Sequence, residues 1–234
     1  MPKATKKVSK TTAKELGRRE QRRVQHQDMS RTQLLDAAEE VFGRKGFHEA
    51  TLKEVADLAE YSVGSVYSFF ENKDDLFRQI FLRRGDEFMT GLRAQFEDET
   101  QTPMEQLHNL IDFECGFFRE HRHFGRLFLR YSSATALGPN REIDDVIAAN
   151  YEEAMDLQAK LIARGQETGQ FRGGDAESLA RLFSGLVAAY QSVDPAVVTD
   201  DPHPGERLPL TELHDLVENA FAAPTSLGRQ AARG

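Results

Sequence analysis

The chain has 234 residues, of which 39% are hydrophobic and 29% charged, and its formal net charge is −8. This length allows one or two domains and a sizeable core. The single cysteine, Cys115, excludes an intramolecular disulfide framework. No apolar run approaches the roughly 18 residues of a membrane-spanning helix, and the N-terminus lacks the apolar stretch of a secretory signal. We therefore expect a cytoplasmic protein with no membrane partner.

The negative charge is distributed unevenly along the chain. Residues 1–31 carry ten Lys or Arg against three Asp or Glu, whereas residues 32–73 carry four against eight. A basic segment ahead of an acidic body can mark contact with nucleic acid or another anionic surface. Because residues 1–29 contain few large apolar side chains, we expect them to form a basic, disordered arm.

The first helix is expected over residues 31–45. Ser30 and Gln33 have the spacing of a capping box, and apolar residues then recur at helical intervals. Gly46 follows the last turn, where a residue without a side chain commonly ends a helix.

Two short helices are expected next, over residues 51–59 and 64–70. Thr51 and Glu54 form a capping box for the first of them, and Ser62 caps the second. Two short helices joined by a tight turn match a helix-turn-helix motif. Val66 and Phe70 would face inward, since they lie four residues apart. The side chains that remain to face outward, as in a helix inserted into the major groove of DNA, are Ser65, Tyr67, Ser68 and Phe69.

The rest of the chain also predicts helices. A proline-rich loop covers residues 194–209, and no hairpin pattern or repeat occurs. The further helices are expected over residues 73–96, 103–120, 123–132, 140–168, 175–192 and 211–222. The sequence therefore predicts an all-α protein of about nine helices.

One run of residues, from Arg31 to Phe81, resembles the DNA-binding domain of the tetracycline-repressor (TetR) family. The residues that carry the resemblance are Ala37, Ala38, Phe42, Gly46, Phe47, Thr51, Val55, Ala56, Ser62, Gly64, Ser65, Val66, Tyr67, Phe70 and Lys73. It implies a dimeric transcriptional regulator, usually a repressor, that binds a pseudo-palindromic operator and leaves it when a small molecule binds the C-terminal domain. The residues that the family pattern places on DNA are Thr51, Ser62, Gly64, Ser65, Tyr67, Ser68, Phe69 and Lys73.

The resemblance also implies a domain organisation. Residues 30–75 would form the DNA-binding domain, with the helix-turn-helix over 51–70, and residues 76–222 the ligand-binding and dimerisation domain. Residues 223–234 would be a tail.

The motif departs from the family pattern at two positions of the turn. Glu60 stands where the family usually has glycine, which suggests a different turn, and Val63 stands where a small or basic residue is common. Residues 51–72 are acidic, although non-specific affinity for DNA depends on cations. We therefore hypothesise that the arm contacts the DNA backbone or enters the minor groove, the alternative being a merely solubilising tail. The cations concerned are Lys3, Lys6, Lys7, Lys10, Lys14, Arg18, Arg19, Arg22 and Arg23.

The C-terminal part contains candidates for an effector pocket, because such pockets are largely apolar and aromatic. Ordinary core packing explains the same spacing equally well. The candidates are Phe113, Phe117, Phe118, Phe128, Tyr131, Met155, Phe183 and Tyr190. Asp112 and Glu114 lie among these aromatics and would suit a cationic ligand, but a solvated helix face is the expected alternative.

The last two predicted helices resemble the pair that forms the dimer interface in this family. Closure of the core within one chain is the alternative. The residues expected in the interface are Leu179, Leu182, Phe183, Leu186, Leu213, Leu216, Val217 and Phe221.

No cofactor, metal site or enzymatic activity is expected. His121 and His123 lack the spacing of helical metal ligands, and no phosphate loop, nucleophile motif or dinucleotide fingerprint occurs. The expected partners are an operator in double-stranded DNA, a small-molecule effector and a second copy of the chain. The alternative function is a helical module that binds a partner other than DNA.

Overall fold

The structure is a computed structural model that describes residues 8–98, 100–135, 145–200 and 208–224. These ranges contain ten helices and no strand, which confirms the all-α fold. The one helix that was not expected is α9 (Pro195–Val198), a single turn inside the proline-rich loop. The chain divides into two compact units, residues 1–79 and 80–234, so the division falls slightly later than the predicted boundary at 75/76.

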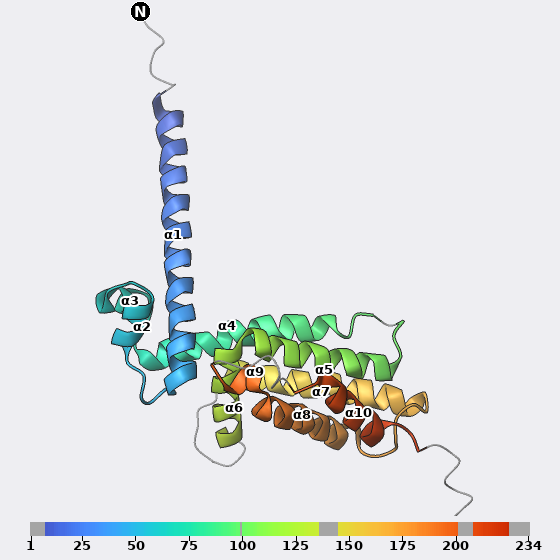
Figure 1. Ribbon diagram of the computed structural model, residues 1–234. Coiled ribbons are helices and arrows are strands. Elements are labelled where there is room, and N and C mark those ends of the chain that lie inside the picture. Colours follow the sequence, from blue (N-terminus) through green and yellow to red (C-terminus); the bar gives the residue numbers. More distant parts are fainter. Residues whose placement is uncertain (1–7, 99, 136–144, 201–207, 225–234) are drawn as a thin grey trace, which may run out of the picture. The chain divides into compact units, whose positions relative to one another are not determined.

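The first unit is built on three helices that pack around a small core (Figure 1). These are α1 (Val8–Lys45), α2 (Leu52–Leu58) and α3 (Val63–Phe69), joined by the first turns of α4 (Lys73–Ala94). The largest side chains of the core are buried, and they are Leu34, Leu35, Phe42, Val55, Val66, Phe70 and Leu76.

Helix α1 corrects two predictions, because it begins at Val8 and passes through Ser30 without interruption. The prediction of a disordered arm is wrong for residues 8–29. The prediction that the helix starts at residue 31, with a capping box at Ser30, is also wrong. The cause is local propensity: the segment is rich in Arg, Gln, Lys and Glu, and a helix that is already nucleated by its packed end extends at little cost. Residues 1–7 of the arm lie outside the described residues.

The second unit contains the remainder of α4 and six further helices. They are α5 (Pro103–Glu120), α6 (Arg122–Thr135), α7 (Asp145–Glu167), α8 (Ala176–Val193), α9 and α10 (Leu210–Phe221). Helices α5, α7, α8 and α10 run alongside one another in Figure 1, and their fully buried residues include Leu107, Ile111, Ile162, Phe183 and Val217. The predicted caps at Thr102 and Asp175 are confirmed. Residues 140–144 of a predicted helix and 225–234 of the predicted tail lie outside the described residues.

Candidate nucleic-acid interface

Helices α2 and α3 are each seven residues long and are fixed at their starts by side-chain caps. The Thr51 hydroxyl accepts a hydrogen bond from the Glu54 N–H, and the Glu54 carboxylate accepts one from the Thr51 N–H, which confirms the capping box. The Lys45 ammonium pairs with the same carboxylate, and together these groups lower the pKa of Glu54 to about 2. The end of α1 is thereby tied to the start of α2.

The turn between α2 and α3 keeps a glycine-like conformation without a glycine. Glu60 has φ 60°, and in the described residues it is the sole non-glycine residue with positive φ. The left-handed region disfavours residues with a side chain. The expectation of a different turn is therefore wrong: Glu60 adopts the conformation for which glycine is suited.

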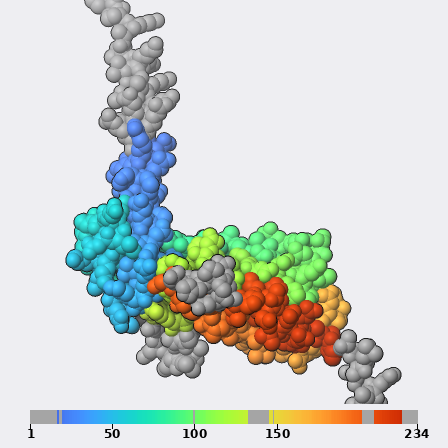
Figure 2. Space-filling view, viewed as in Figure 1, coloured from blue at the N-terminus to red at the C-terminus, as the bar shows by residue number. Residues whose placement is uncertain are grey.

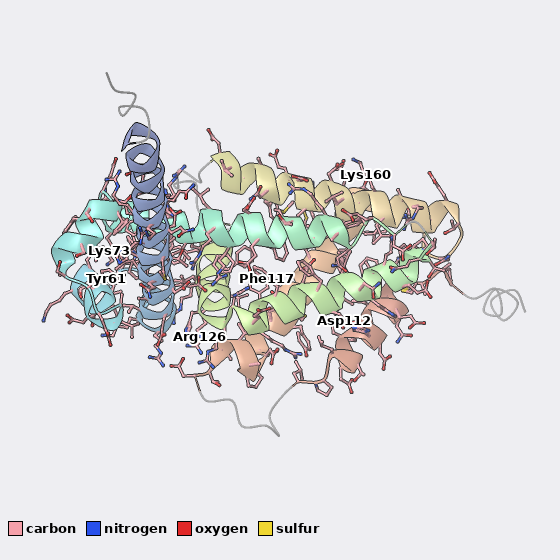
Figure 3. The ribbon with its side chains drawn as sticks, turned by 90° about the horizontal axis from the view of Figure 1, so that it is seen from above. Tyr61, Lys73, Asp112, Phe117, Arg126 and Lys160 are labelled. Atoms are coloured by element: carbon pink, nitrogen blue, oxygen red, sulfur yellow. The ribbon has the colours of Figure 1, made fainter. Side chains whose placement is uncertain are left out.

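A tyrosine that the sequence did not single out anchors this turn. The Tyr61 hydroxyl lies 2.9 Å from the Ser30 hydroxyl and 2.7 Å from the Gln33 side-chain oxygen, both on α1 (Figure 3). Ser30 is buried, so its hydroxyl serves this tertiary contact in place of the predicted helix cap. Such a contact between residues thirty positions apart has no local sequence pattern.

Helix α3 presents one face to the core and the other to solvent. Val66 and Phe70 are buried as predicted, whereas the Tyr67 residue is 57% exposed. Ser68 and Gly64 are also exposed, and Ser65 and Phe69 are half-buried. The outward face predicted from spacing is therefore present, with Tyr67 as its most prominent side chain.

The hydroxyl groups at the start of α3 are already ordered. Ser62 caps the helix by accepting a hydrogen bond from the Ser65 N–H at 3.0 Å, and the two hydroxyls lie 2.8 Å apart. The Ser68 hydroxyl donates to the Ser65 carbonyl at 2.6 Å. A hydroxyl that donates its proton to its own helix keeps its lone pairs for a donor from outside.

Lys73 begins α4 and is held by the corner that precedes α2 (Figure 3). Its ammonium lies 4.5 Å from the centroid of the Phe47 ring and 3.4 Å from the His48 carbonyl oxygen, to which it donates. The predicted phosphate contact of Lys73 would therefore use a cation that the fold has already positioned.

The aromatic pocket candidates form a cluster on α4, α5 and α6. Phe117 lies at its centre: its ring centroid is 5.2 Å from that of Phe88, 5.7 Å from that of Phe118 and 6.1 Å from that of Phe113. The ring centroid of Phe128 lies 5.2 Å from that of Phe118, with the two rings tilted by 38°. The cluster is packed ring against ring, as core packing requires.

The other candidates are placed differently. Tyr131 lies at the edge of the cluster, 6.4 Å from the Phe81 ring. Phe183 is fully buried against Phe221, and the Tyr190 hydroxyl is hydrogen-bonded to Arg119. Met155 lies beside the Ser184 hydroxyl at 3.8 Å. These candidates do not form one site around a described cavity.

Glu114 is buried, which corrects the expectation of a solvated helix face. Its carboxyl oxygen accepts a hydrogen bond from the Gln158 amide at 3.1 Å, and the Gln158 oxygen in turn accepts one from Ser184. Burial raises the pKa of Glu114 to about 8. Asp112, in contrast, is exposed and lies 3.0 Å from His214.

The predicted dimer residues differ in burial, with Leu179 and Leu186 half-buried. Phe183, Leu213, Val217 and Phe221 are at most 3% exposed and belong to the core of their own chain. Leu182 and Leu216 are 61% and 60% exposed. An apolar surface groove of about 330 Å³ lies over α8 and the end of α10, and among the residues that line it are Leu179, Leu182, Gly185, Leu186 and Phe221.

Within the described ranges, none of the helices combines the length and the hydropathy that a membrane span requires. No group of three or more His, Cys, Asp or Glu residues within the same ranges is arranged to hold a metal ion. Cys115 is a buried thiol whose pKa burial raises to about 12.

Comparison with known proteins identifies the first unit. Residues 34–80 match the family model described as "Bacterial regulatory proteins, tetR family". The transcriptional activator FasR of Mycolicibacterium smegmatis is 36% identical over 169 residues, which cover 72% of this chain and 71% of that protein. The transcriptional repressor KstR2 of the same organism is 28% identical over 144 residues, or 61% of this chain and 67% of that protein.

The fold extends beyond the matched motif. The crystal structure of a TetR-like transcriptional regulator from Rhodococcus sp. RHA1 superposes with a TM-score of 0.64 and 25% identity. The superposition covers 81% of this chain and 92% of that structure. The likeness therefore includes helices of the second unit, where the sequence carries no family motif.

Proposed function

Because the chain belongs to the TetR family of bacterial transcriptional regulators, we propose that it is a ligand-responsive repressor that binds a pseudo-palindromic operator as a dimer. The first unit is the DNA-binding domain in this proposal, and the second binds the effector and the second copy. The observation that carries it is the outward face of α3, where Tyr67 is exposed while Val66 and Phe70 anchor the helix.

The chemistry of this face suits the major groove. Tyr67, Ser62, Gly64 and Thr51 would contact phosphates, and Lys73 would meet a further one at the start of α4. Ser65, Ser68 and Phe69 would approach the bases, since a hydroxyl can pair with several base edges and an aromatic ring can contact a thymine methyl group. The Ser68 hydroxyl oxygen would accept a hydrogen bond from the amino group of adenine or cytosine.

The groove over α8 and α10 supports the dimer. The groove combines the exposed Leu182 with the half-buried Leu179 and Leu186, and Leu216 on α10 is exposed as well. Exposed apolar surface of this kind favours association. A two-fold interface uses the same patch on both copies, so these leucines would meet their own counterparts. The interface is then narrower than the set of eight residues expected from the sequence.

A ligand in the second unit would act through the spacing of the two recognition helices. In a dimer these helices must lie about 34–36 Å apart to enter successive major grooves. An effector releases the operator only if it binds the non-operator state more tightly. We place the effector beside the aromatic cluster around Phe117 and the Glu114 network, where it would have to separate rings that pack directly against one another in this structure. The relatives are regulators, and no enzymatic activity is proposed.

An electrophoretic mobility shift with DNA from upstream of the chain's own gene tests the proposal. We expect a retarded complex whose footprint is symmetrical about a two-fold axis and which an unrelated fragment of equal length does not compete away. A chain that binds both fragments equally would contradict sequence-specific regulation, and a chain that binds neither fragment would favour the alternative of a helical module that binds a partner other than DNA.

A further inference from the structure

The part of α1 that precedes the packed core, residues 8–29, is called here the α1 extension. Every residue from Glu20 to Met29 is exposed. Figure 2 shows the blue surface of α1 rising clear of α2 and α3 within the first unit. At about 1.5 Å per residue, the extension is roughly 33 Å long.

The extension is strongly basic while the packed part of its unit is acidic. Residues 8–29 contain six Lys or Arg against three Asp or Glu, whereas residues 32–79 contain five against ten. Lys10, Lys14, Arg18 and Arg22 recur every fourth residue, a spacing that places helix positions along one face. Arg19 and Arg23 repeat the same spacing on a neighbouring line.

We propose that the α1 extension is a second DNA-binding element that contacts the phosphate backbone of duplex DNA as a helix. The element lies outside the helix-turn-helix. Although Arg23 pairs with Glu20 at 2.7 Å, the extension has an excess of cations that α2 and α3 lack. Of the four Asp or Glu in residues 51–72, Glu54 is paired with Lys45, and the single Lys53 lies 4.0 Å from Asp57.

The helical conformation selects how the element binds. An α-helix with side chains is about 10–12 Å in diameter, and the minor groove of B-DNA is about 6 Å wide. The minor-groove arm that the sequence suggested is therefore excluded for residues 8–29. A helix instead spaces its Lys and Arg positions at fixed intervals, which suits successive phosphates along the backbone or the rim of the major groove without reading bases.

The composition of the α1 extension argues against two other binding partners, a membrane surface and a second helix in a coiled coil. A helix that lies on a membrane surface needs a broad apolar face, yet the extension contains only Val8, Leu16, Val24 and Met29 as larger apolar residues. These four also lack the 3,4 spacing of a coiled-coil seam. The composition therefore favours a polyanion that is recognised by charge alone. DNA is the polyanion that the same unit binds in the proposed function, on which this inference rests.

The test uses the full chain and a 30-base-pair duplex of arbitrary sequence, followed by fluorescence anisotropy at several salt concentrations. The variant is Arg22→Gln with Arg23→Gln, which keeps helix propensity because Gln and Arg are both good helix formers. The matched control removes two exposed cations from the second unit, as Lys160→Gln with Arg130→Gln. Circular dichroism checks that helicity is unchanged.

The slope of log K against log salt is negative, and each lost phosphate contact reduces its magnitude by about 0.9. We expect the Arg22/Arg23 variant to lose about 1–2 from this slope per chain, and the control to keep the wild-type slope. A variant with the wild-type slope would overturn the proposal, as would equal losses in variant and control. Strong binding to vesicles of phosphatidylserine, with an unchanged slope on DNA, would overturn it in favour of a membrane.

This result is separable from the proposed function. Ser68→Ala removes a proposed base contact of α3 and is expected to weaken the preference for the operator, while the slope on the arbitrary duplex stays at the wild-type value because no phosphate contact is lost. A chain that loses specificity but keeps the slope retains the α1 extension as a binding element. If instead wild type prefers the operator and the Arg22/Arg23 variant keeps the wild-type slope, the proposed function stands and the α1 extension is not a DNA-binding element.

Discussion

Glu60 shows how a single residue can occupy a conformation that its type disfavours. With φ 60° it costs about 1 kcal/mol relative to a residue without a side chain. We expect Glu60→Gly to raise the free energy of unfolding of the first unit by about 1 kcal/mol, measured by urea denaturation. Glu60→Gln, which removes the charge but keeps the side chain, should leave that free energy unchanged. Equal effects of the two substitutions would place the cost in the charge and contradict backbone strain.

Glu114 is a second residue whose environment opposes its type, and it makes folding depend on pH. Its pKa is about 8 in the folded chain against an ordinary 4.5, so the unfolded chain releases a proton that the folded chain retains. Stability from this group therefore falls as pH rises from about 4.5 to about 8 and is constant above that range.

Glu114→Gln should remove this dependence, because the amide oxygen can still accept from Gln158 and no proton is needed. We expect the variant to be more stable than wild type by about 1–3 kcal/mol at pH 7 and equal to it near pH 4. Urea denaturation across this pH range measures the difference. A pH-independent difference would show that packing, and not protonation, is responsible. Asp112→Asn, at an exposed position on the same helix, is the control.

At the scale of elements, α8 and α10 divide their apolar residues between the core and a free face. We expect Leu182→Glu to shift the proposed dimer toward monomer by at least tenfold in Kd, because in a two-fold interface the new charge would lie beside its own counterpart. Sedimentation equilibrium measures the change. Tyr151→Glu, at a residue 59% exposed on α7, should leave association unchanged. A Leu182→Glu chain that dimerises like wild type would place the interface elsewhere.

The same elements show how far sequence reasoning reaches. Helices with a capping box, such as α2 at Thr51 and α5 at Thr102, were located almost to the residue, because the cap is a local pattern. The predicted start of α1 lies more than twenty residues after the observed start at Val8. A polar helix continues from its packed end without any periodic pattern in the sequence, so the pattern could not locate its beginning.

The candidate site shows the same limit. The spacing of apolar residues predicted the outward face of α3. The hydrogen bond between the Tyr61 and Ser30 hydroxyls and the burial of Glu114 depend on tertiary contacts, which local sequence does not reveal. The eight expected dimer residues could not be sorted by sequence into core and surface, since both faces of an amphipathic pair are apolar.

For the molecule as a whole, the net charge of −8 conceals a separation of charge. The cations are concentrated in the α1 extension, while the packed part of the first unit and the second unit are acidic. Under our two proposals, DNA affinity and operator specificity would be carried by different segments of one unit. Salt should act mainly on the first of these properties, and substitutions on α3 mainly on the second.

The central claim, that α3 reads an operator, is tested most directly by the affinity of Tyr67→Ala for the upstream fragment, measured by anisotropy at fixed salt. Tyr151→Ala is the matched control, because the two tyrosines are 57% and 59% exposed and lie in different units. We expect Tyr67→Ala to weaken binding by 10-fold or more, corresponding to about 1.4 kcal/mol, with the dimer intact by sedimentation, and Tyr151→Ala to bind like wild type. Wild-type affinity of the Tyr67→Ala chain would contradict the account.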